Sequence, residues 1–191
     1  MRPALLSRRS LLGGLALAAG LSRCGAASAR ENLLEQLRQG GLLLFMRHAN
    51  APGIGDPENF RIDDCSTQRN LSDRGRAQAT AVGALLRGEG IRWASVRSSR
   101  WCRCLDTARL AFGAAVPFDL LNSSFAGRPD GTPELRRHLL ALPRDGANRI
   151  YVTHMVNIMR LLNANTADAE IIVARVSGEA IQPIGSLRPP E

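Results

Sequence analysis

The sequence has no lysine, and all 25 basic residues among its 191 positions are arginine. We interpret this as a compositional bias that carries no mechanism. Aromatic residues are also scarce, at 4% of the chain. No basic stretch is interleaved with the aromatic side chains on which nucleic-acid bases stack, so we expect no nucleic-acid partner.

Acidic residues are absent before Glu31, and the segment in front of it has the composition of an export signal. It contains the twin arginine of SRRSLLGG, an apolar stretch too short to span a bilayer, and the small residues of AASA. This order is typical of a twin-arginine signal peptide covering residues 1–29, with cleavage after Ala29. The alternatives are an N-terminal helix buried in the fold, which the glycine pairs disfavour, and a lipid anchor at Cys24.

Processing would leave residues 30–191, which are enough for a single domain. We expect this mature chain to be periplasmic or otherwise extracytoplasmic, without stable insertion into a membrane. Losing four of the 25 arginines against 17 acidic residues lowers the net charge from +8 to +4. A mildly basic chain favours anionic ligands.

Cysteines are few, and three remain after processing: Cys65, Cys102 and Cys104. An odd number in an oxidising compartment allows one disulfide and leaves one thiol. Cys102 and Cys104 would point to nearly opposite sides of a helix, so only one of them can pair with Cys65. Three small buried residues are the alternative. No metal-ligand spacing appears, and we expect neither a metal nor a cofactor.

Apolar runs and helical periodicity alternate along the rest of the chain. They predict strands over 42–46, 92–99, 116–120, 149–154 and 169–176, and helices over 31–39, 72–90, 101–112, 132–142 and 156–162. In the second helix, Ala77, Ala81, Ala84 and Leu85 are expected to form a small-residue face. This order predicts an α/β domain with a mostly parallel sheet and helices on both faces. The aperiodic segment 49–70 is too long for a plain connection and is predicted to be a functional flap.

Two of the predicted strands end at a histidine. His48 follows the run 42–46, with Arg47 just before it, and His154 follows the run 149–153. Arg103 lies one turn into the helix after the second strand. Ligands of open α/β sheets bind beyond the carboxyl ends of the strands, so we expect these four side chains to converge there.

With these residues in place, the chain resembles the histidine phosphatase superfamily, which has the phosphoglycerate-mutase-like fold. Four segments match the family's motifs in order: FMRHA at 45–49, with Ala49 in place of the family's Gly, LSDRGRAQA at 71–79, SSRWCRCLDTA at 98–108, and VTH at 152–154. The resemblance implies that His48 is a nucleophile that takes up a phosphoryl group. It also implies that Arg47, Arg103 and His154 hold that group.

The chemistry is consistent with these residue types. The transition state of phosphoryl transfer spreads charge over three oxygens, so fixed positive donors stabilise it. The guanidinium forks of Arg47 and Arg103 supply paired donors that lysine could not match. A neutral imidazole attacks phosphorus when its other ring nitrogen donates to a fixed acceptor, and water then hydrolyses the phosphohistidine.

The general acid and the substrate contacts are less clear. Met155 follows the second histidine where the family often has Gly or Asp, which removes one usual proton donor. The remaining candidates for the acid are Asp63, Asp64, Asp119 and Asp130. Asn50 and Asn157 are candidates for substrate binding, with turn or cap roles equally open.

We therefore expect a metal-independent phosphatase acting on a phosphorylated small molecule or on phosphohistidine. One alternative is a non-catalytic module that binds a phosphorylated ligand. The retained His48 argues against it, because binding alone would need only the arginines. A phosphomutase is a weaker alternative, since no long insertion is present to hold a second phosphate.

Overall fold

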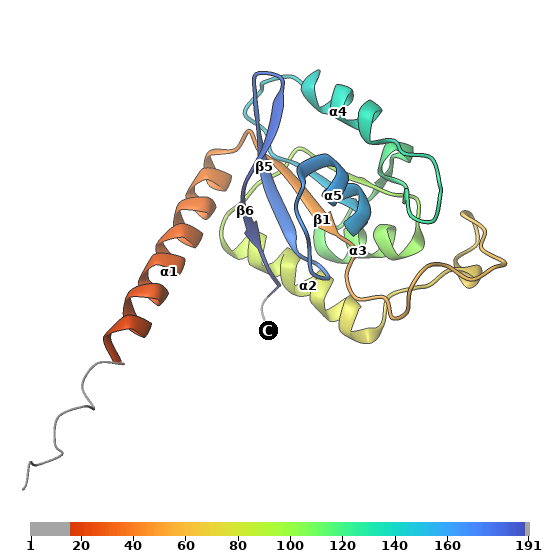
Figure 1. The fold of residues 1–191 in the computed structure, drawn as a ribbon, viewed down its shortest axis with the longest axis horizontal. Coiled ribbons are helices and arrows are strands. Elements are labelled where there is room, and N and C mark those ends of the chain that lie inside the picture. The colour runs from red at the N-terminus through yellow and green to blue at the C-terminus, as the bar shows by residue number, and fades with distance from the viewer. Residues whose placement is uncertain (1–15, 190–191) are drawn as a thin grey trace, which may run out of the picture.

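The computed structural model describes residues 16–189, which form one six-stranded sheet with helices packed on both faces (Figure 1). The helices are α1 (Ala16–Gln39), α2 (Asp73–Gly88), α3 (Cys102–Phe112), α4 (Thr132–Leu140) and α5 (Met155–Leu162). The strands are β1 (Leu43–Arg47), β2 (Ser95–Ser98), β3 (Val116–Pro117), β4 (Arg149–Thr153), β5 (Ile171–Ser177) and β6 (Ala180–Leu187). Short 3₁₀ turns cover Cys65–Thr67 and Asp119–Leu121.

The strand order in the sheet is β3-β2-β4-β1-β5-β6. The first four strands in this order pair in parallel, while β5 runs antiparallel to β1, and β6 antiparallel to β5. The predicted α/β class with a mostly parallel sheet is confirmed. β1 and β4 lie in the middle, where helices cover both faces, and this explains their continuous apolar runs.

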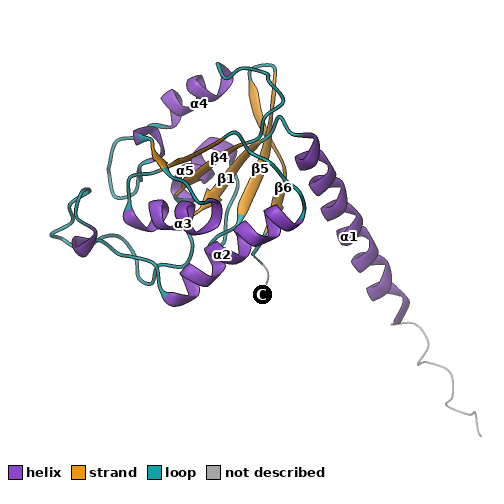
Figure 2. Ribbon diagram, turned by 180° about the vertical axis from the view of Figure 1, so that it is seen from behind, coloured by secondary structure: helices purple, strands orange, loops and turns teal. Residues whose placement is uncertain are grey.

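Alternate residues of the central strands face two separate parts of the core. Leu44 and Met46 of β1 pack with α1, α2 and α3, whereas Leu43 and Phe45 pack with α4 and α5. Figure 2 views the face that carries α2 and α3. Successive side chains of a strand point to opposite faces, so a run of five apolar residues supplies both layers.

The N-terminal helix is longer than predicted. We expected a helix over 31–39, but α1 begins at Ala16 and continues through the predicted cleavage site at Ala29. Its last turns enter the core through Leu33, Leu34 and Leu37. Residues 1–15, which contain the twin arginine, lie outside the described residues, so the export signal remains a prediction. Among residues 16–189, no helix is both long and apolar enough to cross a membrane.

The face of α2 that is buried differs from the predicted one. Ala77 and Ala84 are exposed, and the core side carries Gly75, Gly83 and the larger residues Ala79, Val82 and Leu86. A Cβ added at Gly83 would lie 1.9 Å from the carbonyl oxygen of Ala111. Gly83 therefore lets α2 and α3 approach closely. The sequence analysis missed this face because it considered the alanine side chains of the helix and not the glycines.

The sequence analysis ended at the strand 169–176 and missed β6. Gly178, with φ of +58°, turns the chain back, and β6 pairs with β5 along its length with one irregularity at Val173/Ala174. Pro183 and Gly185 interrupt the apolar pattern that would have indicated a strand. An edge strand tolerates a proline because one side of its backbone needs no partner. β3 is also shorter than predicted, since the 3₁₀ turn replaces its second half.

Candidate active site

The carboxyl ends of β1 and β4 bring the two histidines together. His48 directly follows β1, and its backbone N–H donates to the carbonyl of Thr153 at 2.9 Å. His154 directly follows β4 and precedes the first turn of α5. The ring centroids of His48 and His154 are 5.4 Å apart, and each residue is 4% exposed. Neighbouring parallel strands thus place two residues that are 106 positions apart in the sequence in one crevice.

The hydrogen bonding of His48 defines its tautomer. Nδ1 lies 2.9 Å from the carbonyl oxygen of Ala49. A carbonyl only accepts, so Nδ1 carries the proton and Nε2 keeps its lone pair. Burial lowers the pKa of His48 to about 3, and the charges of Arg103 and Arg47 act in the same direction. The ring is therefore neutral at neutral pH.

Residues of the second and third motifs hold the loop after β1. The hydroxyl of Thr107 accepts from the backbone N–H of Ala49 at 3.0 Å, and the side-chain oxygen of Gln78 accepts from that of Asn50 at 3.0 Å. Gly75 brings α2 against the same loop, since a Cβ there would lie 2.1 Å from the carbonyl oxygen of Asn50. These motif residues act as a scaffold for the nucleophile and do not line the pocket.

The ring of His154 is positioned by two residues that lie outside the pocket lining, Ser99 and Cys104. Its Nε2 lies 2.9 Å from the hydroxyl oxygen of Ser99 and 3.5 Å from the sulfur of Cys104. Burial lowers the pKa of His154 well below its usual value, and the proximity of His48 and Arg103 lowers it further. This imidazole is also neutral at neutral pH.

Arg47 and Arg103 each combine an ion pair with a free donor. Arg103 is 3% exposed, and its Nη1 lies 2.7 Å from a carboxylate oxygen of Asp56. Arg47 pairs with Asp168 at 2.9 Å and donates from Nη1 to the carbonyl of Thr166 at 2.8 Å. The Nε atoms of both arginines are buried without a hydrogen-bond partner. Buried donors of this kind are rare, and an anionic ligand would satisfy them.

These four predicted residues line one cavity of about 330 Å³. Two further arginines, Arg69 and Arg128, also line it, and Asp56 is the only acidic residue that the described part of the chain contributes to the lining. The sequence analysis missed all three, because they lie in the aperiodic segments 49–70 and 121–131, where no motif or spacing distinguishes one arginine or aspartate from another.

Residues 43–121 match the family model described as histidine phosphatase superfamily, branch 1. The matched segment begins with β1 and includes the His48 loop, the flap, α2 and α3. Over this segment the chain is similar to the histidine phosphatase superfamily. This supports a phosphatase activity in the broad sense.

Solved structures of phosphatases have the same fold as this chain. The protein histidine phosphatase SixA, solved with tungstate, is 16% identical, with a TM-score of 0.57 over 78% of this chain and 97% of the other. A putative SixA from Agrobacterium tumefaciens is 20% identical, with a TM-score of 0.53 over 78% and 99%. A mycobacterial glucosyl-3-phosphoglycerate phosphatase is 16% identical, with a TM-score of 0.55 over 74% and 94%. No curated protein sequence matches the chain.

A disulfide connects the flap of this protein to α3. Cys65 pairs with Cys102, with their Cα atoms 5.7 Å apart, and Cys104 remains a buried thiol. The prediction of one disulfide and one thiol is confirmed, and the structure selects Cys102. Burial raises the pKa of Cys104 to about 12, so this thiol stays protonated. Because Cys102 immediately precedes Arg103, the disulfide anchors the flap next to the arginine.

The two predicted substrate-binding asparagines lie outside the pocket lining. Asn50 donates to Asp168 at 2.9 Å and accepts from the hydroxyl of Ser72 at 2.6 Å. The amide of Asn157 donates to the carbonyls of Leu121 and Asn122, at 3.0 and 2.8 Å, while its oxygen accepts from Ser124. Both side chains therefore hold loops around the site.

The four candidate acids also lie outside the pocket lining. Each is paired with an arginine elsewhere: Asp63 and Asp119 with Arg100, Asp64 with Arg61, and Asp130 with Arg160. Hydrogen bonds from Ser66 and Arg61 lower the pKa of Asp64 to about 2, and hydrogen bonds from Thr132 lower that of Asp130. The general acid therefore has no assigned residue.

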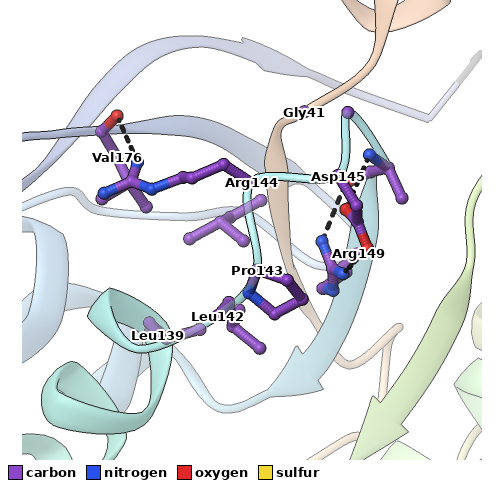
Figure 3. Close-up of a pocket in the computed structure, with 11 residues that line it drawn as sticks. Gly41, Leu139, Leu142, Pro143, Arg144, Asp145, Arg149 and Val176 are labelled. Atoms are coloured by element: carbon purple, nitrogen blue, oxygen red, sulfur yellow. Dashed lines mark hydrogen bonds and ion pairs between the residues drawn. The ribbon is translucent and has the colours of Figure 1, made fainter.

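A second, much smaller cavity of about 40 Å³ lies at the opposite end of β1 and β4 (Figure 3). Its charged side chains are already paired: Arg149 with Asp145 at 2.6 Å, and Arg144 with the carbonyl of Val176 at 3.2 Å. No histidine or cysteine lines this cavity. It offers no group for catalysis.

Proposed function

We propose that this protein hydrolyses a phosphomonoester or a phosphohistidine through a covalent phosphohistidine on His48. The observation that carries the proposal is the neutral His48 ring, bound through Nδ1 to Ala49 in a pocket lined by four arginines. The resemblance in fold to a protein histidine phosphatase solved with tungstate supports an oxyanion-binding pocket of this kind.

In the first step, Nε2 of His48 attacks phosphorus. A P–N bond forms, the bond to the leaving group breaks, and the leaving group takes the electron pair. The proton stays on Nδ1, where the carbonyl of Ala49 stabilises the positive charge that develops on the ring. The guanidinium groups of Arg47 and Arg103 stabilise the charge on the equatorial oxygens. A water molecule then attacks phosphorus and the P–N bond breaks. The electron pair of that bond returns to Nε2 of neutral His48, and the protons of the water leave with the phosphate.

His154 acts as a neutral hydrogen-bond donor in this mechanism. Nε2 of His154 lies 2.9 Å from the hydroxyl oxygen of Ser99. In this mechanism Ser99 is the donor of that hydrogen bond, and the proton of the ring is on Nδ1. An Nδ1–H group is suited to donate to a phosphoryl oxygen. A neutral donor avoids adding a further buried positive charge beside four arginines.

No acid is assigned to protonate the leaving group. Asp56 lines the pocket, and burial raises its pKa, but hydrogen bonds from Arg103 and Trp101 outweigh burial and lower it overall. An ionised carboxylate cannot donate a proton. The reaction therefore favours leaving groups that depart without protonation, as in aryl phosphates and phosphohistidine. A positioned acid typically contributes about 10² to 10⁴-fold.

The decisive experiment is His48→Ala, assayed with p-nitrophenyl phosphate. Turnover should fall to background, because the attacking atom is gone, and rapid-quench mass spectrometry should find the phosphoryl adduct on wild-type His48 alone. His138→Ala is the matched control: His138 packs against Phe118, with 5.0 Å between ring centroids, and lies outside the pocket lining. Residual turnover within about tenfold of wild type would remove His48 from this role.

The second candidate is a non-catalytic module that binds a phosphorylated ligand in the same pocket. It predicts binding of tungstate without turnover in the wild-type protein. A phosphomutase is a third candidate, and it predicts transfer of phosphate between two positions of a substrate without net release.

We also propose that residues 1–29 are a twin-arginine-type signal peptide and that the mature protein acts outside the cytoplasm. The Cys65–Cys102 disulfide supports this location, because disulfides persist in oxidising compartments.

A further inference from the structure

Apolar side chains gather at the mouth of the pocket. Three of the large hydrophobic side chains that are exposed in the described part of the chain line this one cavity: Ile54, Phe125 and Met155, which are 93%, 49% and 43% exposed. We call these three residues the apolar rim. The other large exposed hydrophobic residues, Leu110, Val116 and Met159, lie outside the lining.

Two loops hold the rim in place. Ile54 lies at the tip of the flap between Gly53 and Gly55, whose φ angles of +95° and +71° turn the backbone sharply on either side of it. A Cβ added at Gly55 would lie 3.9 Å from the ring of Phe125, so the flap and the loop 122–131 meet at this edge. Met155 is the first residue of α5, directly after His154, and lines the same cavity.

The pocket therefore has two chemically distinct parts. Arg47, Arg103, His48 and His154 form a cationic and hydrogen-bonding floor suited to a phosphoryl group. The three rim side chains are apolar, and their one hydrogen-bonding group is the thioether of Met155, a weak acceptor 4.0 Å from Nη1 of Arg47, so the rim is suited to apolar surface. A volume of about 330 Å³ lies in the range of small-molecule sites, roughly 300–1,000 Å³, and leaves room beyond the phosphoryl group itself.

We propose that the substrate is a small-molecule phosphate whose phosphoryl group is bonded to an apolar aromatic or alkyl-aromatic moiety, and that the apolar rim binds this moiety. The inference rests on the proposed function, because it takes the cationic floor to be the part of the pocket that binds the phosphoryl group. It adds that specificity comes from Ile54, Phe125 and Met155. Contact with the rim removes both the rim and the moiety from water, which favours larger apolar groups.

The test measures binding of two non-hydrolysable probes, phenylphosphonate and 4-butylphenylphosphonate, by isothermal titration calorimetry. Each buried methylene strengthens binding by up to about fourfold, so wild type should bind the butyl compound at least about tenfold more tightly. The double variant Ile54→Ser/Phe125→Ser should reduce this ratio to about twofold or less. Val116→Ser, a substitution of a residue that is 56% exposed but outside the pocket, should keep the wild-type ratio.

Equal affinities of the two phosphonates for wild type would overturn the inference, and so would a failure of both to bind. A butyl preference that survives in the double variant would also overturn it, because the rim would not be its source. Turnover of p-nitrophenyl phosphate separates the two proposals. If wild type turns over p-nitrophenyl phosphate but shows no preference for the butyl compound, the phosphatase activity stands and the binding role of the apolar rim is rejected. If wild type prefers the butyl compound but shows no turnover, the binding role of the rim stands and the phosphatase activity is rejected.

Discussion

Arg103 combines a full positive charge with almost complete burial, since it is 3% exposed. A buried guanidinium needs a counter-charge, and Asp56 supplies it at 2.7 Å. The same guanidinium retains a buried Nε–H without a partner. Its position in α3, directly after the disulfide-bonded Cys102, fixes where this donor can lie.

Arg103→Ala should lower kcat/KM by about 10²- to 10³-fold, because the loss of one charge-stabilising donor costs roughly 3–4 kcal/mol in the transition state. Steady-state kinetics with p-nitrophenyl phosphate measure the change. Arg100→Ala is the matched control, since Arg100 lies three positions earlier, has a side chain that is 42% exposed and pairs with Asp63 at 2.6 Å. Equal losses in the two variants would contradict a role for Arg103 in the transition state.

Asp56 should make stability depend on pH. Burial raises the pKa of its carboxyl, but hydrogen bonds from Arg103 and Trp101 outweigh burial and hold it below the usual value. A group with a depressed folded pKa contributes stability above its unfolded pKa, about 3.9, and loses this contribution as the pH falls through the folded value.

Asp56→Asn should therefore lower the free energy of unfolding at pH 7, by up to about 3–5 kcal/mol, because Arg103 loses its buried partner. The deficit should begin to shrink below about pH 4, where the carboxyl of the unfolded wild type takes up a proton, and should continue to shrink as the pH falls through the lower folded pKa. Urea denaturation at a series of pH values measures both effects. Asp63→Asn, at a side chain that is 75% exposed, should change little. A deficit that stays constant down to pH 3 would be inconsistent with this linkage.

At the scale of elements, the flap depends on tethers more than on its own secondary structure. Within residues 49–70, the only regular element is the 3₁₀ turn Cys65–Thr67. Gln68 accepts from the backbone N–H of Cys102 at 3.0 Å, and the disulfide adds a covalent connection at the same place. Trp101 donates to Asp56 at 2.9 Å and stacks on Phe60, which ties the flap to the start of α3.

Cys65→Ser should lower the free energy of unfolding by roughly 3–4 kcal/mol, the value expected for a disulfide that closes a separation of 37 residues. Urea denaturation of the variant and of the oxidised wild type measures the difference. Dithiothreitol provides the control, since it should destabilise wild type to a similar extent and leave Cys65→Ser unchanged. Identical stability of variant and oxidised wild type would show that the disulfide contributes nothing to the fold.

At the scale of the whole molecule, the prediction concerns export. A fusion of residues 1–35 to a reporter should be exported, and replacing both Arg8 and Arg9 by lysine should block it, because a twin-arginine signal requires the arginine pair. Cell fractionation measures the location of the reporter. Arg23→Lys changes an arginine outside the pair and should leave export intact. Export that persists in the double variant would point to the general secretory route.

The sequence by itself determined the layered architecture, three residues at the strand ends and one arginine in the first turn of α3. The runs at 42–46 and 149–153 are apolar on both faces, so they predict central strands, and the residues after them must lie at one edge of the sheet. Arg47, His48 and His154 could be named because motif and strand end coincide, and Arg103 because its motif places it one turn into the helix after a strand. β6 could not be predicted, because Pro183 and Gly185 interrupt its apolar pattern. The buried face of α2 could not be predicted either, because Gly75 and Gly83, which have no side chain, face the core.

Only the tertiary structure decided what surrounds those four residues. Asp56, Arg69 and Arg128 enter the pocket from aperiodic loops, whose course depends on tethers between distant segments and not on local periodicity. The choice of Cys102 over Cys104 depends on which side of α3 faces the flap, and the apolar rim depends on two loops meeting at Gly55 and Phe125. Periodicity specifies which side of an element is buried, whereas loop positions follow from contacts that form only once the elements have packed.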